Sequence, residues 1–133
     1  MTRATERRLL QAVVALLCLI PLSTATAGIL GGAEWLAHAP VRPDLDSHFR
    51  YLSGIFLGMA FGFASCIPAI ERQGARFRLL GMMVVIGGLA RAWSLLSVGA
   101  PSTGHLVGLC VELGAVPLVL LWQASLQRRW QRG

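Results

Sequence analysis

The stretch LLQAVVALLCLIPLSTATAGIL, residues 9–30, lies between Arg8 and Glu34 and contains no charged residue. A helix that crosses a bilayer needs about 20 apolar residues, because the hydrocarbon core is about 30 Å thick and a helix rises ~1.5 Å per residue. Three further stretches meet this requirement, at residues 51–70, 79–98 and 106–126. Lipid offers the backbone no hydrogen bonds, so each stretch should be helical. The sequence therefore predicts an all-α integral membrane four-helix bundle.

The composition also indicates that lipid is the solvent. Hydrophobic residues make up 55% of the chain and charged residues 14%, whereas soluble domains are about a quarter charged. Because the connections are short and no internal repeat appears, residues 1–133 are predicted to form a single transmembrane domain. All twelve basic residues are arginines and the net charge is +6. They lie at the predicted membrane edges and not along one helical face, which argues against a nucleic-acid partner.

The arginines predict the orientation of the chain. Most lie in three clusters, before the first stretch, between the second and third, and after the fourth: Arg3, Arg7, Arg8; Arg72, Arg76, Arg78; Arg128, Arg129, Arg132. If all four stretches span, these clusters share one side, and the positive-inside rule places that side and both termini in the cytoplasm. The sequence thus predicts a multi-pass protein of the inner (cytoplasmic) membrane, in contact with the lipid bilayer.

The N-terminal stretch permits a second interpretation. Arg7 and Arg8, an apolar run to Ile20 and the small residues 25–27 resemble a cleavable signal peptide, whose removal would leave three helices. Residues 28–30 extend the apolar run to full spanning length, and the matching arginine clusters require four spans. The uncleaved helix is therefore the preferred prediction.

Small residues predict close helix packing. Gly54, Gly58 and Gly62 recur every four residues and so share one face of their helix. Helices in lipid associate through close packing and polar contacts, because lipid tails are as apolar as leucine. Packing inside one bundle is the favoured interpretation, and an interface in a homo-oligomer or a larger membrane complex stays open. Pro117 lacks a backbone donor and is predicted to kink the last helix.

Two charges fall inside the predicted spans, Arg91 and Glu112. An unpaired charge in mid-membrane costs on the order of 2.5–3.5 kcal/mol or more. Counted from the cytoplasmic ends of their helices, Arg91 lies about 18 Å deep and Glu112 about 21 Å deep. Because a short connection makes the two helices antiparallel neighbours, an ion pair facing the bundle interior is predicted. Two roles stay open: the pair fixes the register of the helices, or it lines a cavity for a polar ligand or a proton.

A polar segment, DLDSHFRYLSG at residues 44–54, precedes the second predicted span. Asp46 or Ser47 could cap that helix, Asp46 and Arg50 are spaced to pair one turn apart, and so are Asp44 and His48. A purely structural interpretation covers every residue. The alternative is an outward-facing binding site at an outer lip, which we define as Asp46, His48, Arg50 and Tyr51.

The chain lacks the sequence patterns of common catalytic and redox sites. It has no C-x-x-C, P-loop, G-x-S-x-G or H-E-x-x-H motif, and its three cysteines are predicted at different depths. Aspartate and histidine can bind divalent metals, but no ligand spacing is present. No catalytic residue, metal site or cofactor is therefore predicted.

Three segments, DSHFRYLSGIFLG, IGGLARAWSLLSVGAPS and ELGAVPLVLLWQ, together resemble a bacterial family of small four-helix membrane proteins known as domain of unknown function 4345. The resemblance runs from about Leu9 to Arg128. It is distantly similar in turn to DoxX-like four-helix proteins, some of which are tied to respiratory or redox complexes. The resemblance implies the same topology and an uncleaved first helix. The positions it marks as characteristic are Asp46, Arg50, Tyr51, Gly54, Gly88, Arg91, Gly99, Pro101, Glu112 and Pro117.

These observations favour a non-enzymatic membrane protein, either an accessory subunit or a small binding module. Its candidate polar centre is Arg91 with Glu112, and the outer lip is a second candidate binding region. The runner-up is a proton-linked small-molecule transporter or a quinone-linked redox component, with Glu112 as the proton-linked group. An enzyme is the least favoured, because no pairing of nucleophile and base is visible.

Overall fold

The computed structural model describes residues 2–132, and over these residues the chain is helical with no β-strand. Four of its helical segments are long and apolar enough to cross a membrane, so the predicted all-α architecture with four membrane-length helices is confirmed. The first segment is α1 and the second is α2 continued by a short 3₁₀ turn. The third is α3, and the fourth runs through α4, η2 and α5. The bounds are α1 Arg3–Ala37, α2 Pro43–Cys66, η1 Ile67–Ala69, α3 Gly74–Ser97, α4 Thr103–Cys110, η2 Val111–Ala115 and α5 Val116–Gln131.

Each of the four helical segments begins before the apolar stretch that predicted it. The largest difference is at the start of α2, which begins at Pro43 instead of near Tyr51. Proline suits a first helical position, because its fixed φ is already helical and its missing N–H would have no partner there. Arg42 precedes it as the N-cap and makes no side-chain capping bond. The prediction that Asp46 or Ser47 caps this helix is therefore wrong, since both lie inside it.

The chain divides into two compact units. The first comprises the residues up to Gln11 together with Pro68 and all that follow it, and the second comprises Ala12–Ile67. The start of α1 thus belongs with α3, α4 and α5, while the remainder of α1 belongs with α2.

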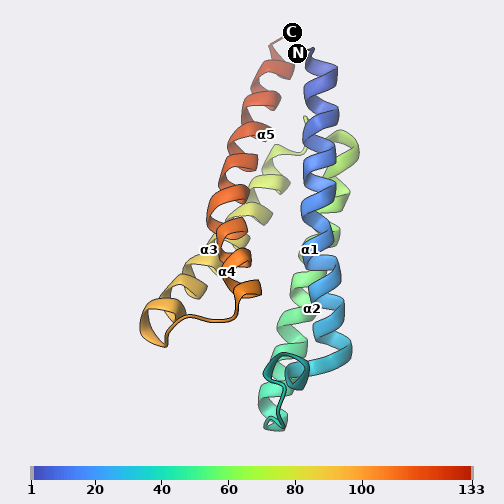
Figure 1. Cartoon of the computed structure of the whole chain (residues 1–133). Coiled ribbons are helices and arrows are strands. Elements are labelled where there is room, and N and C mark those ends of the chain that lie inside the picture. Colours follow the sequence, from blue (N-terminus) through green and yellow to red (C-terminus); the bar gives the residue numbers. More distant parts are fainter. Residues whose placement is uncertain (1, 133) are drawn as a thin grey trace. The chain divides into compact units, whose positions relative to one another are not determined.

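In the first unit α3 and α5 lie side by side (Figure 1). Fully buried side chains fill this unit near the chain termini, among them Leu10 of α1, Phe77 of α3 and Leu126 of α5. Gln123 is also fully buried, and its Nε2 donates to the carbonyl of Ile70 at 2.8 Å. The ends of α1 and α5 are therefore held together by a well-packed core.

In the second unit small residues line the contact between α1 and α2. Ala25 and Gly28 of α1 and Ala60 of α2 are buried. A Cβ added at Gly28 would lie 3.2 Å from the ring of Phe49 and 2.5 Å from Ser53 Oγ. The two backbones therefore approach as closely as glycine allows, which is the packing expected of helices in lipid.

Large apolar side chains point outward along the spans. Leu16, Trp93 and Leu118 are each about two-thirds or more exposed. Such side chains would be unfavourable in water over so large an area, and they suit contact with lipid tails. The exposed surface of the spans is thus consistent with a bilayer as the surrounding medium.

Candidate functional site

Arg91 of α3 and Glu112 of η2 form a two-point ion pair. Arg91 Nε lies 3.0 Å from Glu112 Oε2, and Arg91 Nη2 lies 3.0 Å from Oε1. Two parallel N–H···O bonds fix the orientation of both side chains as well as their separation. The ion pair predicted from matching depths in the two spans is confirmed.

Glycine at position 88 makes this contact possible. A Cβ added at Gly88 would lie 2.9 Å from the Cβ of Glu112 and 2.8 Å from Cδ2 of Leu113. Gly88 lies three residues before Arg91, on the same face of α3. The missing side chain therefore brings η2 close enough for both carboxylate oxygens to reach the guanidinium.

Glu112 lies in a π-helical segment, Val111–Ala115, inside the fourth span. The N–H of Val116 donates to the carbonyl of Val111, one residue further back than in an α-helix. Pro117 is the second residue of α5. Its missing N–H costs little hydrogen bonding there, because the π-turn before it has already changed which carbonyls the backbone N–H groups reach. The sequence predicted a kink at Pro117, and the structure has a change of helix type shortly before it, at Val111–Ala115.

The ion pair is only partly enclosed. The Glu112 side chain is 12% exposed and the Arg91 side chain 33%. Over residues 2–132 the structure gives Arg91 Nη1 no partner, because Nε and Nη2 make the two bonds to Glu112. Arg91 therefore has a nitrogen, Nη1, that no described residue pairs with, on a partly exposed side chain inside an apolar membrane-length helix.

The outer lip is organised around a break in α1. Gly32 has φ 64° and ψ −167°, which is not helical and which residues with a side chain rarely adopt. A continuous helix would bond the N–H of Ala33 to the carbonyl of Ile29. That N–H instead donates to Asp46 Oδ1 at 2.8 Å.

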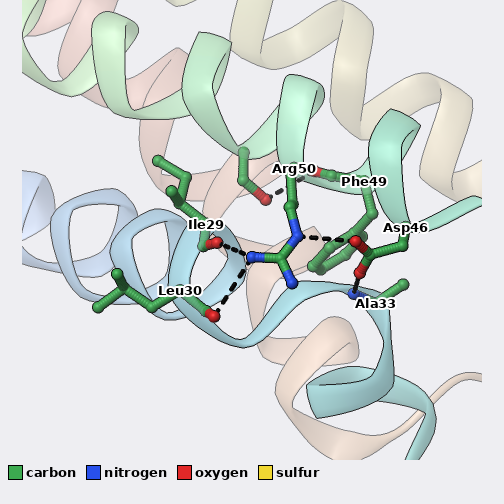
Figure 2. A network of polar contacts seen from close by, with 7 residues as sticks. Ile29, Leu30, Ala33, Asp46, Phe49 and Arg50 are labelled. Atoms are coloured by element: carbon green, nitrogen blue, oxygen red, sulfur yellow. Dashed lines mark hydrogen bonds and ion pairs between the residues drawn. The ribbon is translucent and has the colours of Figure 1, made fainter. Parts of the chain in front are cut away.

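Arg50 occupies the other side of the break. Its Nη1 donates to the carbonyl of Ile29 and, at 3.3 Å, to that of Leu30, while its Nε donates to Asp46 Oδ2 at 2.7 Å. Figure 2 shows the guanidinium between these carbonyls and the carboxylate. The predicted Asp46–Arg50 pair is thus confirmed, and it replaces the hydrogen bonds that α1 loses at Gly32.

The other polar residues of this segment are not part of the network. Asp44 lies 3.7 Å from Arg42, and both side chains are almost fully exposed, so it does not form the predicted pair with His48. Over residues 2–132 the structure gives His48 and Tyr51 no hydrogen bond or ion pair, and both are exposed. Only Asp46 and Arg50 of the four lip residues are brought together.

Comparison with known proteins identifies the family. The family described as a domain of unknown function (DUF4345) matches residues 9–123, most of the chain. The chain belongs to the DUF4345 family. No curated protein and no solved structure matches it.

The matched region of this DUF4345 chain contains both polar groups described above, the Arg91–Glu112 pair and the Asp46–Arg50 pair. Gly88, which admits the first pair, also lies within it. Gly99 lies just after α3 with φ 118°, a conformation that favours glycine, so it ends that helix. The positions that the resemblance marked are thus mostly at the two ion pairs and at helix boundaries.

Two of the three glycines on the face of α2, Gly54 and Gly58, border open space. A Cβ added at Gly54 or Gly58 would meet no atom within 4 Å, whereas the buried residues Ser53 and Ala60 mark the face toward α1. The packing role of Gly54, Gly58 and Gly62 therefore stays a prediction, with the bundle interior and a second copy both open.

Sequence reasoning missed a third polar cluster, in the first unit of this DUF4345 chain. Glu6 Oε1 accepts from Trp122 Nε1 at 2.9 Å and from Arg129 Nη2 at 2.5 Å. Glu71 lies 2.8 Å from Arg7 Nε, and both carboxylates are about 95% buried. The only signal in the sequence was that each glutamate stands among the arginines at a membrane edge, where a solvated charge is the usual interpretation.

Over residues 2–132 no three His, Cys, Asp or Glu side chains are grouped so that they could hold a metal ion. The Asp46–Arg50 and Arg91–Glu112 pairs supply charged hydrogen-bond donors and acceptors within membrane-length helices. Such groups bind polar atoms strongly, because no water competes for them.

Proposed function

We propose that this DUF4345 chain is a non-enzymatic membrane protein, a small binding module or accessory subunit, whose polar centre is the Arg91–Glu112 pair. The observation that carries the proposal is a nitrogen of Arg91, Nη1, that is unpaired within residues 2–132, on a side chain 33% exposed within a membrane-length helix. A guanidinium donor facing hydrocarbon without a partner is unfavourable by several kcal/mol. A ligand or partner subunit that presents an acceptor oxygen would remove that cost.

The ligand class follows from the geometry. Glu112 uses both oxygens on Arg91, so the pair carries little net charge, while three of the five N–H groups of Arg91 stay unpaired within the described part of the chain, two of them on Nη1. A neutral carbonyl oxygen needs one donor and no counter-charge, whereas a carboxylate or phosphate would compete with Glu112 for the guanidinium. The pair therefore favours a carbonyl-bearing group, such as a lipid ester, a quinone or a backbone carbonyl of a neighbouring helix.

We place the chain as one transmembrane domain over residues 1–133, in the inner membrane, with both termini cytoplasmic. Support comes from the first unit, where contacts bring together arginines from all three clusters. Arg7 reaches Glu71 beside Arg72, and Arg129 reaches Glu6. The end of the chain so formed is strongly cationic, which the positive-inside rule assigns to the cytoplasm.

Cysteine labelling of intact cells tests this orientation. In a Cys110→Ser background, Ala4→Cys and Gln131→Cys are expected to resist a membrane-impermeant maleimide until the cells are opened. Ala39→Cys, between α1 and α2, is expected to react at once. Immediate labelling of Ala4→Cys would reverse the orientation or indicate that the first helix is absent.

In this proposal the outer lip serves two purposes. Asp46 and Arg50 hold the broken end of α1, and they are not free to bind a ligand. His48 and Tyr51 are the exposed members and remain candidate binding residues.

The binding test is extraction of the protein from its own membrane in lipid nanodiscs, followed by mass analysis of bound small molecules and proteins. Parent protein is expected to carry a molecule or subunit that Arg91→Gln loses. Arg42→Gln, which alters an exposed arginine, should retain it. The same material with both variants would contradict the proposal.

Two measurements, proton uptake into vesicles and the quinone content of the extract, test the runner-up functions. The favouring observation is that Glu112 is an ionisable carboxylate within a span, which a proton-linked transporter needs. A transporter predicts proton uptake into vesicles that Glu112→Gln abolishes while the protein stays folded. A quinone-linked redox component predicts quinone in the extract of parent protein and none in that of Arg91→Gln.

A further inference from the structure

A cationic surface forms in the first unit where the two ends of the chain meet. Nine of the twelve arginines lie in the flanks of the apolar stretches there, at residues 3–8, 72–78 and 128–132. The contacts of Arg7 with Glu71 and of Arg129 with Glu6 join the flank of α1 to the flanks of α3 and α5. Figure 1 shows the start of α1 and the end of α5 at one end of this unit.

The two carboxylates of this region do not neutralise the surface. Glu6 and Glu71 are 5% exposed; Glu6 pairs with Arg129 and Trp122, and Glu71 pairs with Arg7 and, at 4.0 Å, with Arg72. They therefore pair with three of the nine arginines, and positive charge remains in excess.

Four arginines are exposed and have no hydrogen bond or ion pair with any residue in 2–132: Arg3, Arg8, Arg128 and Arg132. Arg128 lies in the last turn of α5 and Arg132, four residues on, is its C-cap, so the two side chains leave the helix end on one face. These four groups border apolar stretches that begin at Leu9 and end at Leu126, which places them at the level of lipid headgroups.

We propose that Arg3, Arg8, Arg128 and Arg132 form a binding surface for the phosphates of anionic phospholipid headgroups. The guanidinium is a fork of donors that matches phosphate oxygens. Four such groups without a protein counter-charge, at the depth of the headgroups, leave the membrane as the source of the negative charge. A zwitterionic headgroup brings its own cation and gains less. The proposal is independent of the role of Arg91 and Glu112.

The test uses the full chain, purified in a neutral detergent, with binding of phosphatidylglycerol and phosphatidylcholine measured by native mass spectrometry. Parent protein is expected to prefer phosphatidylglycerol, and the preference should weaken as salt is raised. Each arginine near a membrane surface contributes about fivefold to such binding. The variant Arg3→Gln/Arg8→Gln/Arg128→Gln/Arg132→Gln should therefore bind phosphatidylglycerol about 600-fold more weakly.

Two controls keep the test specific. Lysine at the same four positions should retain most of the affinity, and Arg128→Gln/Arg132→Gln should lose part of it even if the fourfold variant does not fold. Inorganic phosphate at the same concentration should not displace the lipid. Undiminished binding by the glutamine variants, equal losses with lysine and with glutamine, or displacement by inorganic phosphate would each overturn the proposal.

Discussion

Arg50 and Asp46, one turn apart on α2, bind opposite sides of the break that Gly32 makes in α1. Arg50 donates to the carbonyls of Ile29 and Leu30 before the break, and Asp46 accepts from the N–H of Ala33 after it. In lipid an unbonded backbone group is costly, so a helix can be broken near a membrane only where other groups replace its bonds. One ion pair supplies both a donor and an acceptor, and this explains why the charges stand at this spacing.

The first prediction concerns Gly32 itself. Gly32→Ala is expected to destabilise the folded protein by about 1–3 kcal/mol, because alanine is strained at this positive φ. Its Cβ would also overlap the Asp46 carboxylate and the Arg50 guanidinium. Thermal unfolding in detergent would measure the loss. Gly58→Ala is the matched control, since its Cβ meets nothing within 4 Å, and alanine inside a helix should then leave stability unchanged or slightly raised.

A second prediction concerns the choice of arginine at position 50. Arg50→Lys keeps the charge but is expected to lower the unfolding temperature nearly as much as Arg50→Gln. The reason is geometric, because one ammonium cannot reach the Asp46 carboxylate and the carbonyls of Ile29 and Leu30 together. Full recovery of the unfolding temperature with lysine would show that charge alone holds the break.

Much of this arrangement could be predicted from the sequence where the determining signal is local. Apolar run length gave the four membrane-length helices, and a four-residue spacing gave the Asp46–Arg50 pair. The Arg91–Glu112 pair spans two helices, but a short connection fixes their relative depth, so it too was predictable.

The two features that the sequence did not predict, the break at Gly32 and the contacts of Glu6, depend on residues that are distant in the sequence. Gly32 resembles any glycine of a membrane helix, and it breaks α1 only because groups on α2 replace the lost bonds. Trp122 reaches Glu6 across most of the chain length, so nothing near Glu6 distinguishes it from a solvated charge. The packing role of Gly54, Gly58 and Gly62 stays a prediction, and a Cβ at Gly54 or Gly58 would meet no atom within 4 Å.

A third prediction concerns the close approach at Gly88. Gly88→Ala is expected to destabilise the protein by about 1–3 kcal/mol, because the new methyl group crowds Leu113 and Glu112 and drives α3 away from η2. Gly87→Ala is the matched control at the next position, where a Cβ meets nothing within 4 Å. Differential scanning of the two variants in the same detergent would compare them. Equal effects would mean that helix propensity, and not the approach to η2, decides the outcome.

The fourth prediction is a double-mutant cycle on the central ion pair. Arg91→Leu and Glu112→Leu should each destabilise the protein by about 3 kcal/mol, near the lower limit for breaking a buried pair, because a third of Arg91 is exposed. The double variant should recover much of this loss, since two leucines leave no unpaired charge in the span. Chemical or thermal unfolding in one detergent would give all four stabilities.

The exposed pair Arg42 and Asp44 provides a matched cycle, because these residues lie 3.7 Å apart with side chains almost fully exposed. Water screens such a pair, so its coupling should be too small to measure. A large coupling at Arg91 and Glu112 alone would establish that the span encloses a structural ion pair. If the two single variants were as stable as the parent, Arg91 and Glu112 would contribute nothing to the fold. Their retention in an apolar span would then require a ligand, a partner or a proton.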